Sequence, residues 1–321
     1  MSQGPPIRIF FVDFWHPPTE ERIRTNPLFK LLEKHFNLVL TPEKPDFVIH
    51  SCFGLSFVNY DGIRIFYTGE NVRPNLAYTD YAFSFDLEES DRSFRLPLYR
   101  LYAEYDELFR PRDPDRVMAE ERRFCSFLYS NRTARSRVTF FDKLSKYKPI
   151  DSGGKVRNTL GYFVQDKMAF LRSCKFSIAF ENGSYPGYTT EKLLHALTAD
   201  TVPIYWGSPE VHLDFNREAF VNCHDYRSFD EVVEVVREID RNDDLYRKYL
   251  SAPYLPGGQE TSWCREEVIV DRFRRIFEER KPQISPSLKA RHARLDRHLL
   301  KAQSVLQKAR RAAKRWTTTY G

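Results

Sequence analysis

The residues with the clearest chemical potential lie at positions 180–209, which read FENGSYPGYTTEKLLHALTADTVPIYWGSP. We expect a strand to end at Phe180 and a helix to begin after Thr190, a suitable N-cap residue. Ligands of α/β sheets bind outside the carboxyl ends of strands, and the free N–H groups of a helix start attract phosphate. Lys192 in the first helical turn would add positive charge. This pattern predicts a phosphate site, although the residues alone also fit an ordinary capped helix.

Two basic blocks could complete such a site. The first, SNRTARSR, follows an expected strand and ends in Arg137, whose planar guanidinium matches a phosphate group bidentately. The second, DSGGKVRNT at 151–159, places Lys155 and Arg157 beside two glycines that free the backbone. Each block alone could be a solvated surface loop. Together with the helix start, they favour a site for a diphosphate.

A carboxylate follows another expected strand, in the segment IRIFYTGEN at 63–71. Glu70 would lie at the carboxyl end of this buried strand, next to Asn71, and could act there as a general base. Taken alone, a surface glutamate that begins a loop is the simpler interpretation.

The elements that must position these residues alternate between strands and helices. In the first part we expect a helix at 26–36 and strands at 7–14, 47–52, 63–68 and 81–85. In the second part we expect helices at 137–147, 191–197 and 229–239 and strands at 124–129, 176–180, 202–205 and 219–221. Such alternation is typical of parallel α/β sheets. The charged, proline-containing stretch 109–123 reads as a linker between the two parts.

Composition narrows the class of protein. Aromatic residues make up 15% of the 321 residues, which suits packed cores and rings that cover the faces of sugars. No apolar run reaches the roughly 20 residues that span a bilayer, and the N-terminal segment reads as a first strand. The five cysteines are too widely spaced for a zinc or disulfide framework, which favours a cytoplasmic protein. The only D-x-D, Asp113-Pro114-Asp115, lies in the charged stretch, so we expect no metal site.

Positive charge is concentrated in the C-terminal tail. Residues 281–321 hold eleven Lys or Arg and one Asp, whereas residues 1–280 hold 39 basic and 43 acidic side chains. Apolar residues recur from Leu288 to Trp316 in steps of three and four, apart from one gap at His292. This predicts one helix, separate from the body, with Lys289 among the bases on its other faces. Its use stays open between binding an anionic membrane at its inner face, self-association and packing on the body. We do not expect a nucleic-acid-binding body.

Read together, four of these blocks resemble the α-1,3-fucosyltransferases of glycosyltransferase family 10, and most closely the bacterial members. The blocks are FYTGEN, LYSN followed by Arg137, GGKVRNTLGY and FENGSYPGYTTEKL…PIYWGSP, and the resemblance covers about residues 7–280. It implies an α/β GT-B fold with two Rossmann-like domains facing across a cleft, at 1–118 and 119–280, followed by a basic helical tail at 281–321. It also implies GDP-β-L-fucose as the donor, inversion at the anomeric carbon, and no metal or other cofactor.

The resemblance also implies roles for the residues that match the family's motifs. Glu70 is the expected general base and would contact the acceptor together with Asn71. Glu191 is the expected donor-site carboxylate, which contacts sugar hydroxyls or the developing cation. Arg137 and Lys192 would neutralise the leaving diphosphate. The remaining expected donor contacts are Asn182, Tyr188 and Arg157.

The acceptor is the most open part of this interpretation. The family suggests a GlcNAc-containing oligosaccharide, either N-acetyllactosamine-like or a chitooligosaccharide, with O3 of GlcNAc as the nucleophile. A GT-B transferase that uses another nucleotide sugar is the main alternative. An inactive nucleotide-binding scaffold is a second alternative, and the joint presence of Glu70, Glu191, Arg137 and Lys192 argues against it.

Overall fold

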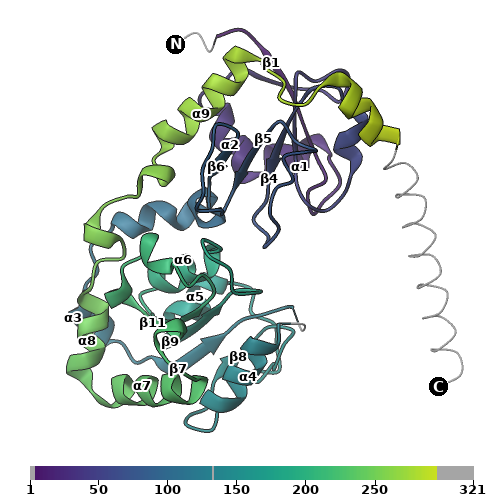
Figure 1. Cartoon of the computed structure of the whole chain (residues 1–321). Helices are drawn as coiled ribbons and strands as arrows, with labels where there is room; N and C mark the ends of the chain where they lie inside the picture. The colour runs from purple at the N-terminus through teal and green to yellow at the C-terminus, as the bar shows by residue number, and fades with distance from the viewer. Residues whose placement is uncertain (1–3, 132–133, 295–321) are drawn as a thin grey trace, which may run out of the picture. The chain divides into compact units, whose positions relative to one another are not determined.

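Two compact α/β units make up the computed structural model, which describes residues 4–131 and 134–294 (Figure 1). Among these residues, unit 1 comprises residues 4–84, 88–94 and 270–294, and unit 2 comprises residues 85–87 and 95–269. Each unit contains one mostly parallel sheet, so the predicted alternation of strands and helices is confirmed in both.

Unit 1 contains a six-stranded sheet in the order β2-β1-β3-β4-β5-β6. Its strands are β1 (Ile7–Val12), β2 (Leu38–Leu40), β3 (Phe47–His50), β4 (Ile63–Tyr67), β5 (Tyr81–Ser84) and β6 (Ser93–Arg95). Its helices are α1 (Glu20–Arg24), α2 (Pro27–Glu33), the 3₁₀ turn η1 (Ser56–Asn59) and most of α9 (Glu266–Glu279). The first five strands pair in parallel, and four of them were predicted from the sequence.

Helices α2 and α9 cover one face of this sheet, as Figure 1 shows. The contacts are made by aromatic rings, with centroids 4.1–5.8 Å apart, in the pairs Phe11–Phe29, Phe47–Phe277 and Phe83–Phe273. Side chains alternate between the faces of a strand. His50 therefore points to the opposite face, where its ring stacks on Phe57 of η1 at 3.8 Å.

Unit 2 contains a five-stranded parallel sheet in the order β11-β10-β9-β7-β8. Its strands are β7 (Arg123–Phe127), β8 (Asp151–Ser152), β9 (Cys174–Phe180), β10 (Val202–Trp206) and β11 (Val221–Asn222). Its α-helices are α3 (Pro114–Ala119), α4 (Arg135–Leu144), α5 (Lys167–Arg172), α6 (Glu191–Thr198), α7 (Phe229–Arg241) and α8 (Asp243–Ser251). Its 3₁₀ turns are η2 (Leu98–Leu101), η3 (Ala103–Phe109), η4 (Val211–Leu213), η5 (Arg217–Ala219), η6 (Cys223–Asp225), η7 (Pro256–Gly258) and η8 (Ser262–Cys264).

Helices cover both faces of the second sheet. Helices α4, α7 and α8 bury apolar side chains against one face, and α6 packs with η2 and η3 against the other. In both units the strand that comes first in the sequence lies between the second and the third, which is the 2-1-3-4-5 order of doubly wound folds. Ligands of such sheets bind outside the carboxyl ends of the first and third strands, where the strand order reverses. The two switch points are β1/β3 in unit 1 and β7/β9 in unit 2.

The stretch 109–123 is not a linker, and this prediction was wrong. It lies inside unit 2, and it contains α3 with Val117 buried in the core. Its arginines converge on the buried carboxylate of Asp200, where Arg110 and Arg116 form ion pairs at 3.1 and 2.7 Å. Arg122 donates to the main-chain carbonyl of the same residue at 2.8 Å. Local composition suggested exposure because this common partner lies about 80 residues further along the chain.

The contacts also divide the chain differently from the ranges 1–118, 119–280 and 281–321. Residues 95–118 pack with unit 2, and residues 270–279 of α9 return to unit 1. The return is explained by Phe273 and Phe277, whose rings contact phenylalanines of the first sheet. No helix in the described part of the chain is long and apolar enough to cross a membrane.

The beginning of the tail is part of unit 1, contrary to the prediction of a separate helix. Asp80 accepts hydrogen bonds from the main-chain N–H groups of Gln283 and Ile284, both at 2.7 Å. Lys289 is buried and lies 2.9 Å from the same carboxylate, so it does not belong to an exposed basic face. His292 is also buried and stacks on Tyr78 at 4.0 Å. The rest of the predicted helix, from residue 295 onwards, lies outside the described residues.

Candidate active site

Arg137 bridges the switch point of unit 2. It lies in the first turn of α4, after β7, and its side chain is buried. Its Nε donates to the carbonyl of Phe180, the last residue of β9, at 3.0 Å, and its Nη2 donates to Oδ1 of Asn182 at 2.7 Å. These contacts hold a permanent cation at the carboxyl edge of the sheet, and both acceptors, a main-chain carbonyl and a side-chain amide, are neutral.

The aromatic ring of Tyr129 packs against the guanidinium of Arg137. The guanidinium carbon of Arg137 lies 4.1 Å from the centroid of the Tyr129 ring, an arrangement that stabilises a cation. The phenol donates to the carbonyl of Ile178 at 2.7 Å and accepts the N–H of Phe180 at the same distance. Gly154 explains part of the GGKVRNT block, because a Cβ atom there would overlap the Tyr129 backbone. The glycine therefore permits close packing behind the arginine.

A buried glutamate organises the start of α6. Glu181 is fully buried directly after β9, and its carboxylate accepts the N–H of Thr190 at 2.7 Å and the Thr190 hydroxyl at 2.8 Å. Lys192 Nζ lies 2.9 Å from the same carboxylate. Thr190 does occupy the N-cap position, as predicted, but its side chain does not cap the helix because the hydroxyl bonds to Glu181.

Glu191 and Lys192 form an ionised pair at the edge of this cluster. Their side chains are 3.4 Å apart. Burial opposes ionisation of Glu191, but Lys192 and Lys167 outweigh it and lower the pKa of Glu191 to about 2. Burial likewise opposes the charge of Lys192, but Glu181 and Glu191 raise its pKa above the usual value. Both groups therefore stay charged at neutral pH.

A second pair of titratable groups lies beside Glu191 on the same unit. Lys167 Nζ is 2.7 Å from Nδ1 of His195, whose Nε2 is 3.4 Å from Glu104. Burial and the neighbouring Lys167 lower the pKa of His195 to about 4, so the imidazole is neutral at neutral pH. Burial also lowers the pKa of Lys167. The immediate surroundings of Glu191 therefore hold two lysines, Lys167 and Lys192, and a neutral histidine.

The loop between β9 and α6 is tightly packed. Gly187 has φ +80°, and its N–H donates to the Ser208 hydroxyl at 2.8 Å. The ring of Tyr188 is buried and packs edge-on against Phe85 at 5.2 Å. Tyr188 therefore helps to fix the conformation of the loop, and a direct donor contact from its side chain stays a prediction.

Arg157 is not brought to this cluster. It is exposed with φ +50°, and its guanidinium pairs with Asp142 of α4 at 2.6 Å. The prediction rested on its place after the two glycines and on the resemblance of this block to the family's motif. Of the expected donor residues, the structure brings Arg137 to Asn182 and Glu191 to Lys192, and it leaves Arg157 on the surface of the unit.

Glu70 lies where the sequence predicted, at the carboxyl end of β4 in unit 1. The strand is fully buried, and Glu70 follows it by three residues in a half-buried loop. Its N–H donates to the Thr68 hydroxyl at 3.1 Å, which fixes the turn that presents the carboxylate. Asn71 is exposed beside it.

The two aspartates of the D-x-D are engaged within unit 2. Asp113 caps α3 by accepting the N–H of Arg116 at 3.0 Å, and Asp115 pairs with Arg247 at 2.5 Å. No group of three or more His, Cys, Asp or Glu side chains among residues 4–131 and 134–294 is arranged to hold a metal ion.

Glu181 was missed by the sequence analysis. The sequence shows that Glu181 directly follows an apolar strand, but its neighbour Asn182 lies at the same strand end. The adjacent residues do not reveal whether a glutamate in such a position is buried or exposed. The signal that could have identified Glu181 is a pair of polar residues nine and eleven positions later, Thr190 and Lys192. A tight loop can bring both of them back to the strand end, where they can bind a buried carboxylate.

These features define a class of protein: an α/β protein with two doubly wound units, one with a cationic strand edge and the other with a carboxylate at a strand end. The α/β GT-B fold predicted from the sequence is thereby confirmed, because both units and the similar solved structures agree with it. Residues 9–102 match the family described as the alpha-(1,3)-fucosyltransferase FucT N-terminal domain. Residues 118–253 match glycosyltransferase family 10 (fucosyltransferase) C-term. The chain belongs to glycosyltransferase family 10, the fucosyltransferases.

Individual relatives agree with this assignment. The chain is 35% identical over 283 residues to alpha-(1,3)-fucosyltransferase FucT of Helicobacter pylori, which covers 75% of this chain and 59% of that protein. The chain therefore spans less than two thirds of that relative. It is also 30% identical over 139 residues to the human 4-galactosyl-N-acetylglucosaminide 3-alpha-L-fucosyltransferase 9. This match covers 42% of this chain and 38% of the human protein.

Solved structures extend the comparison to most of the chain. A crystal structure of an α1,3-fucosyltransferase with GDP-fucose superposes with a TM-score of 0.76 at 30% identity, covering 89% of this chain and 94% of that one. A protein from Anabaena in complex with UDP-glucose has a TM-score of 0.50 at 9% identity, which is a likeness of fold alone.

Proposed function

We propose that this protein transfers L-fucose from GDP-β-L-fucose, with inversion, to O3 of GlcNAc in an oligosaccharide acceptor, forming an α-1,3 linkage. The observation that supports this most is the cationic edge of unit 2, where Arg137, Asn182, Lys192 and the start of α6 meet at the end of β9. A family relative at 30% identity has been crystallised with GDP-fucose, which supports this donor.

Arg137 and Lys192 would stabilise the leaving GDP. The bond from fucose to the diphosphate breaks early in such a displacement, so negative charge grows on the leaving group and positive charge on the sugar ring. Two fixed cations at a strand edge are suited to the first charge. Glu191, which is ionised beside them, is suited to sugar hydroxyls or to the second charge.

Glu70 would act as the general base that takes the proton of the attacking hydroxyl. A base must present an accessible carboxylate, and the place of Glu70 in a half-buried turn after β4, where the Thr68 hydroxyl holds its backbone N–H, supports this role. Asn71, exposed next to it, would contact the same acceptor.

We further propose that the reaction needs no metal ion or other cofactor, because the side-chain cations Arg137 and Lys192 would neutralise a diphosphate in place of a metal. We also propose a cytoplasmic enzyme whose residues beyond 294 bind an anionic membrane surface or a second copy of the chain. The high basic charge of that segment supports the membrane surface, and its seam of apolar residues supports self-association.

A donor panel tests the proposed function. Purified protein is incubated with N-acetyllactosamine or chitobiose and with GDP-fucose, GDP-mannose or a UDP-sugar, in EDTA and in Mn²⁺. We expect transfer from GDP-fucose alone, at similar rates with and without metal. Transfer from another nucleotide sugar would support the alternative GT-B transferase, and a strict need for Mn²⁺ would contradict the metal-free donor site.

A further inference from the structure

Two exposed aromatic residues flank the switch point of unit 1. Trp15 follows β1 and is 74% exposed, and Phe53 follows β3 and is 42% exposed. Their rings meet edge to face, with centroids 5.1 Å apart. Leaving a tryptophan in water forgoes one of the largest hydrophobic gains available to a side chain. Such exposure at the edge where doubly wound sheets bind ligands therefore indicates a binding surface.

The backbone beneath these rings is held in a fixed conformation. Asp13 has φ +60°, and its carboxylate accepts the N–H groups of Ser56 at 3.0 Å and Phe57 at 2.9 Å. Gly54 allows this approach, because a Cβ atom there would overlap the Asp13 carboxylate. The loops after β1 and β3 are thus joined, and the aromatic pair is presented without the need to order a mobile segment.

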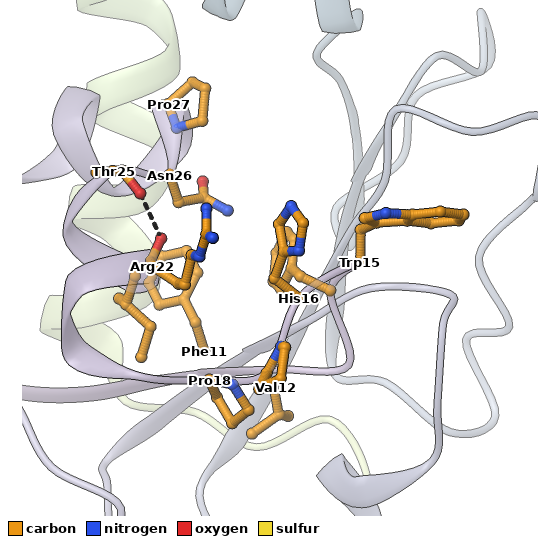
Figure 2. Close-up of a pocket in the computed structure, with 12 residues that line it drawn as sticks. Phe11, Val12, Trp15, His16, Pro18, Arg22, Thr25, Asn26 and Pro27 are labelled. Atoms are coloured by element: carbon orange, nitrogen blue, oxygen red, sulfur yellow. Dashed lines mark hydrogen bonds between the residues drawn. The ribbon is translucent and has the colours of Figure 1, made fainter. Parts of the chain in front are cut away.

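A cavity of about 230 Å³ continues from Trp15. Figure 2 shows His16 between Trp15 and the α1–α2 junction, where Arg22 and Asn26 line the opposite wall. Apolar side chains, among them Phe11, form much of its remaining lining. A mainly apolar hollow with a few polar groups at its rim is typical of sites for small organic ligands.

The order of the strands places this surface next to Glu70. β3 lies between β1 and β4, so Phe53 comes between the strand that ends near Trp15 and the strand that ends near Glu70. Neighbouring strands are about 4.8 Å apart, which separates the ends of β1 and β4 by roughly 10 Å. A ligand that starts at Glu70 and passes Phe53 to reach Trp15 must be longer than one sugar ring.

We propose that Trp15 and Phe53 form an acceptor wall, which binds the apolar C–H face of a second sugar ring while Glu70 faces the hydroxyl that is fucosylated. The inference rests on the proposed function for the role of Glu70, and it adds the residues that select acceptors of at least two rings. The ligand class is a neutral oligosaccharide, because flat aromatic rings recognise the C–H faces of pyranoses without charge.

Direct binding measurements test the wall separately from turnover. The affinities of N-acetyllactosamine, chitobiose and free GlcNAc are measured by calorimetry or saturation-transfer NMR for the wild type, Trp15→Ala, Trp15→Phe and Phe53→Ala. We expect Trp15→Ala and Phe53→Ala to weaken at least one disaccharide about tenfold, to change GlcNAc binding less than threefold, and to leave GDP affinity and Tm unchanged. Trp15→Phe should retain most of the affinity.

The matched control is Phe109→Ala, which removes another exposed ring that has an edge-to-face neighbour, Tyr105, in unit 2. It should bind every sugar as the wild type does. Unchanged disaccharide affinity in Trp15→Ala, an equal loss for GlcNAc and the disaccharides, or a loss of GDP affinity or Tm would each overturn the proposal. Absence of fucose transfer by the wild type would instead contradict the proposed function, because the binding assay does not depend on it.

Discussion

Arg137 and Asn182 are joined by a 2.7 Å hydrogen bond across the switch point of unit 2. Arg137 follows β7 and Asn182 follows β9, the first and third strands of that sheet in sequence order. Their contact therefore links the two strand ends between which ligands of doubly wound sheets bind. The bond also fixes the guanidinium before any ligand arrives, which reduces the ordering that binding would otherwise require.

Removing either predicted diphosphate cation should weaken donor binding. We expect Arg137→Ala and Lys192→Ala each to cost roughly 1.5–3 kcal/mol of GDP affinity, because each removes a charge-assisted contact to phosphate. Calorimetry with GDP measures this loss. Arg135→Ala is the matched control, since Arg135 lies in the same helix turn but is exposed, and it should bind GDP normally. Wild-type affinity in both first variants would place the donor elsewhere.

Glu181 should be needed for stability, whereas Lys192 should be needed for the donor. Glu181→Gln leaves the partly buried Lys192 without its closest carboxylate, and breaking a buried pair in this way costs about 3–5 kcal/mol. The double variant Glu181→Gln/Lys192→Met removes both charges and should recover much of the free energy of unfolding, but not GDP affinity. Denaturant unfolding and calorimetry separate the two effects. A double variant as unstable as Glu181→Gln would contradict this assignment.

His50 should make unit 1 less stable in mild acid. Burial lowers the pKa of this imidazole to about 3, against about 6.5 in the unfolded chain. The unfolded state therefore binds more protons than the folded state between these values, so stability is present above pH 6.5 and is lost as the pH falls towards 3. Between pH 7 and pH 5 the loss from this residue should be about 2 kcal/mol.

The variant His50→Gln should flatten that pH dependence, although its stability at pH 7 will also fall because the side chain is buried against Phe57. Urea unfolding at pH 5 and pH 7 measures how much the free energy of unfolding changes between the two pH values. His212→Gln, at an exposed position, is the control and should keep the wild-type slope. An equally steep slope in His50→Gln would contradict this explanation.

The sequence was sufficient to predict most strands of the two sheets, though not β2, β6 or β8, and the strand ends that carry Glu70 and Asn182. Runs of β-branched and aromatic residues bounded by Gly, Pro or charged residues placed Glu70 after β4 and Asn182 after β9, and both lie there. The helical register then placed Arg137 and Lys192 in first turns. These features follow from periodicity and from chain breaks, which depend only on neighbouring residues.

Long-range ion pairs could not be predicted in this way. Arg157 turns to Asp142, which is 15 residues away, and Lys289 to Asp80, which is more than 200 residues away. Each of these pairings decides whether a charged residue is exposed, buried or directed at the site. The neighbouring residues do not determine which partner is used. A lysine beside a row of leucines is therefore predicted to be exposed unless its distant partner is known.

Two truncations should separate the structural part of the tail from the rest. A chain that ends at Pro282 loses the bonds of Gln283, Ile284 and Lys289 to Asp80, so its Tm should fall by several degrees. A chain that ends at Arg294 should keep the full-length Tm and its activity on small acceptors, and should lose co-sedimentation with anionic liposomes. Equal Tm values for the two truncations would contradict the observed packing, and liposome binding by the Arg294 chain would contradict the membrane role.

The central claim is that unit 2 binds GDP-fucose while Glu70 of unit 1 deprotonates the acceptor. The most direct test is the initial rate of fucose transfer to N-acetyllactosamine or chitobiose by the wild type and by Glu70→Gln, with GDP affinity measured on the same samples. We predict that Glu70→Gln lowers the rate 10²- to 10⁴-fold, as loss of a general base does, with GDP affinity unchanged. Transfer by Glu70→Gln at a near wild-type rate would contradict this account.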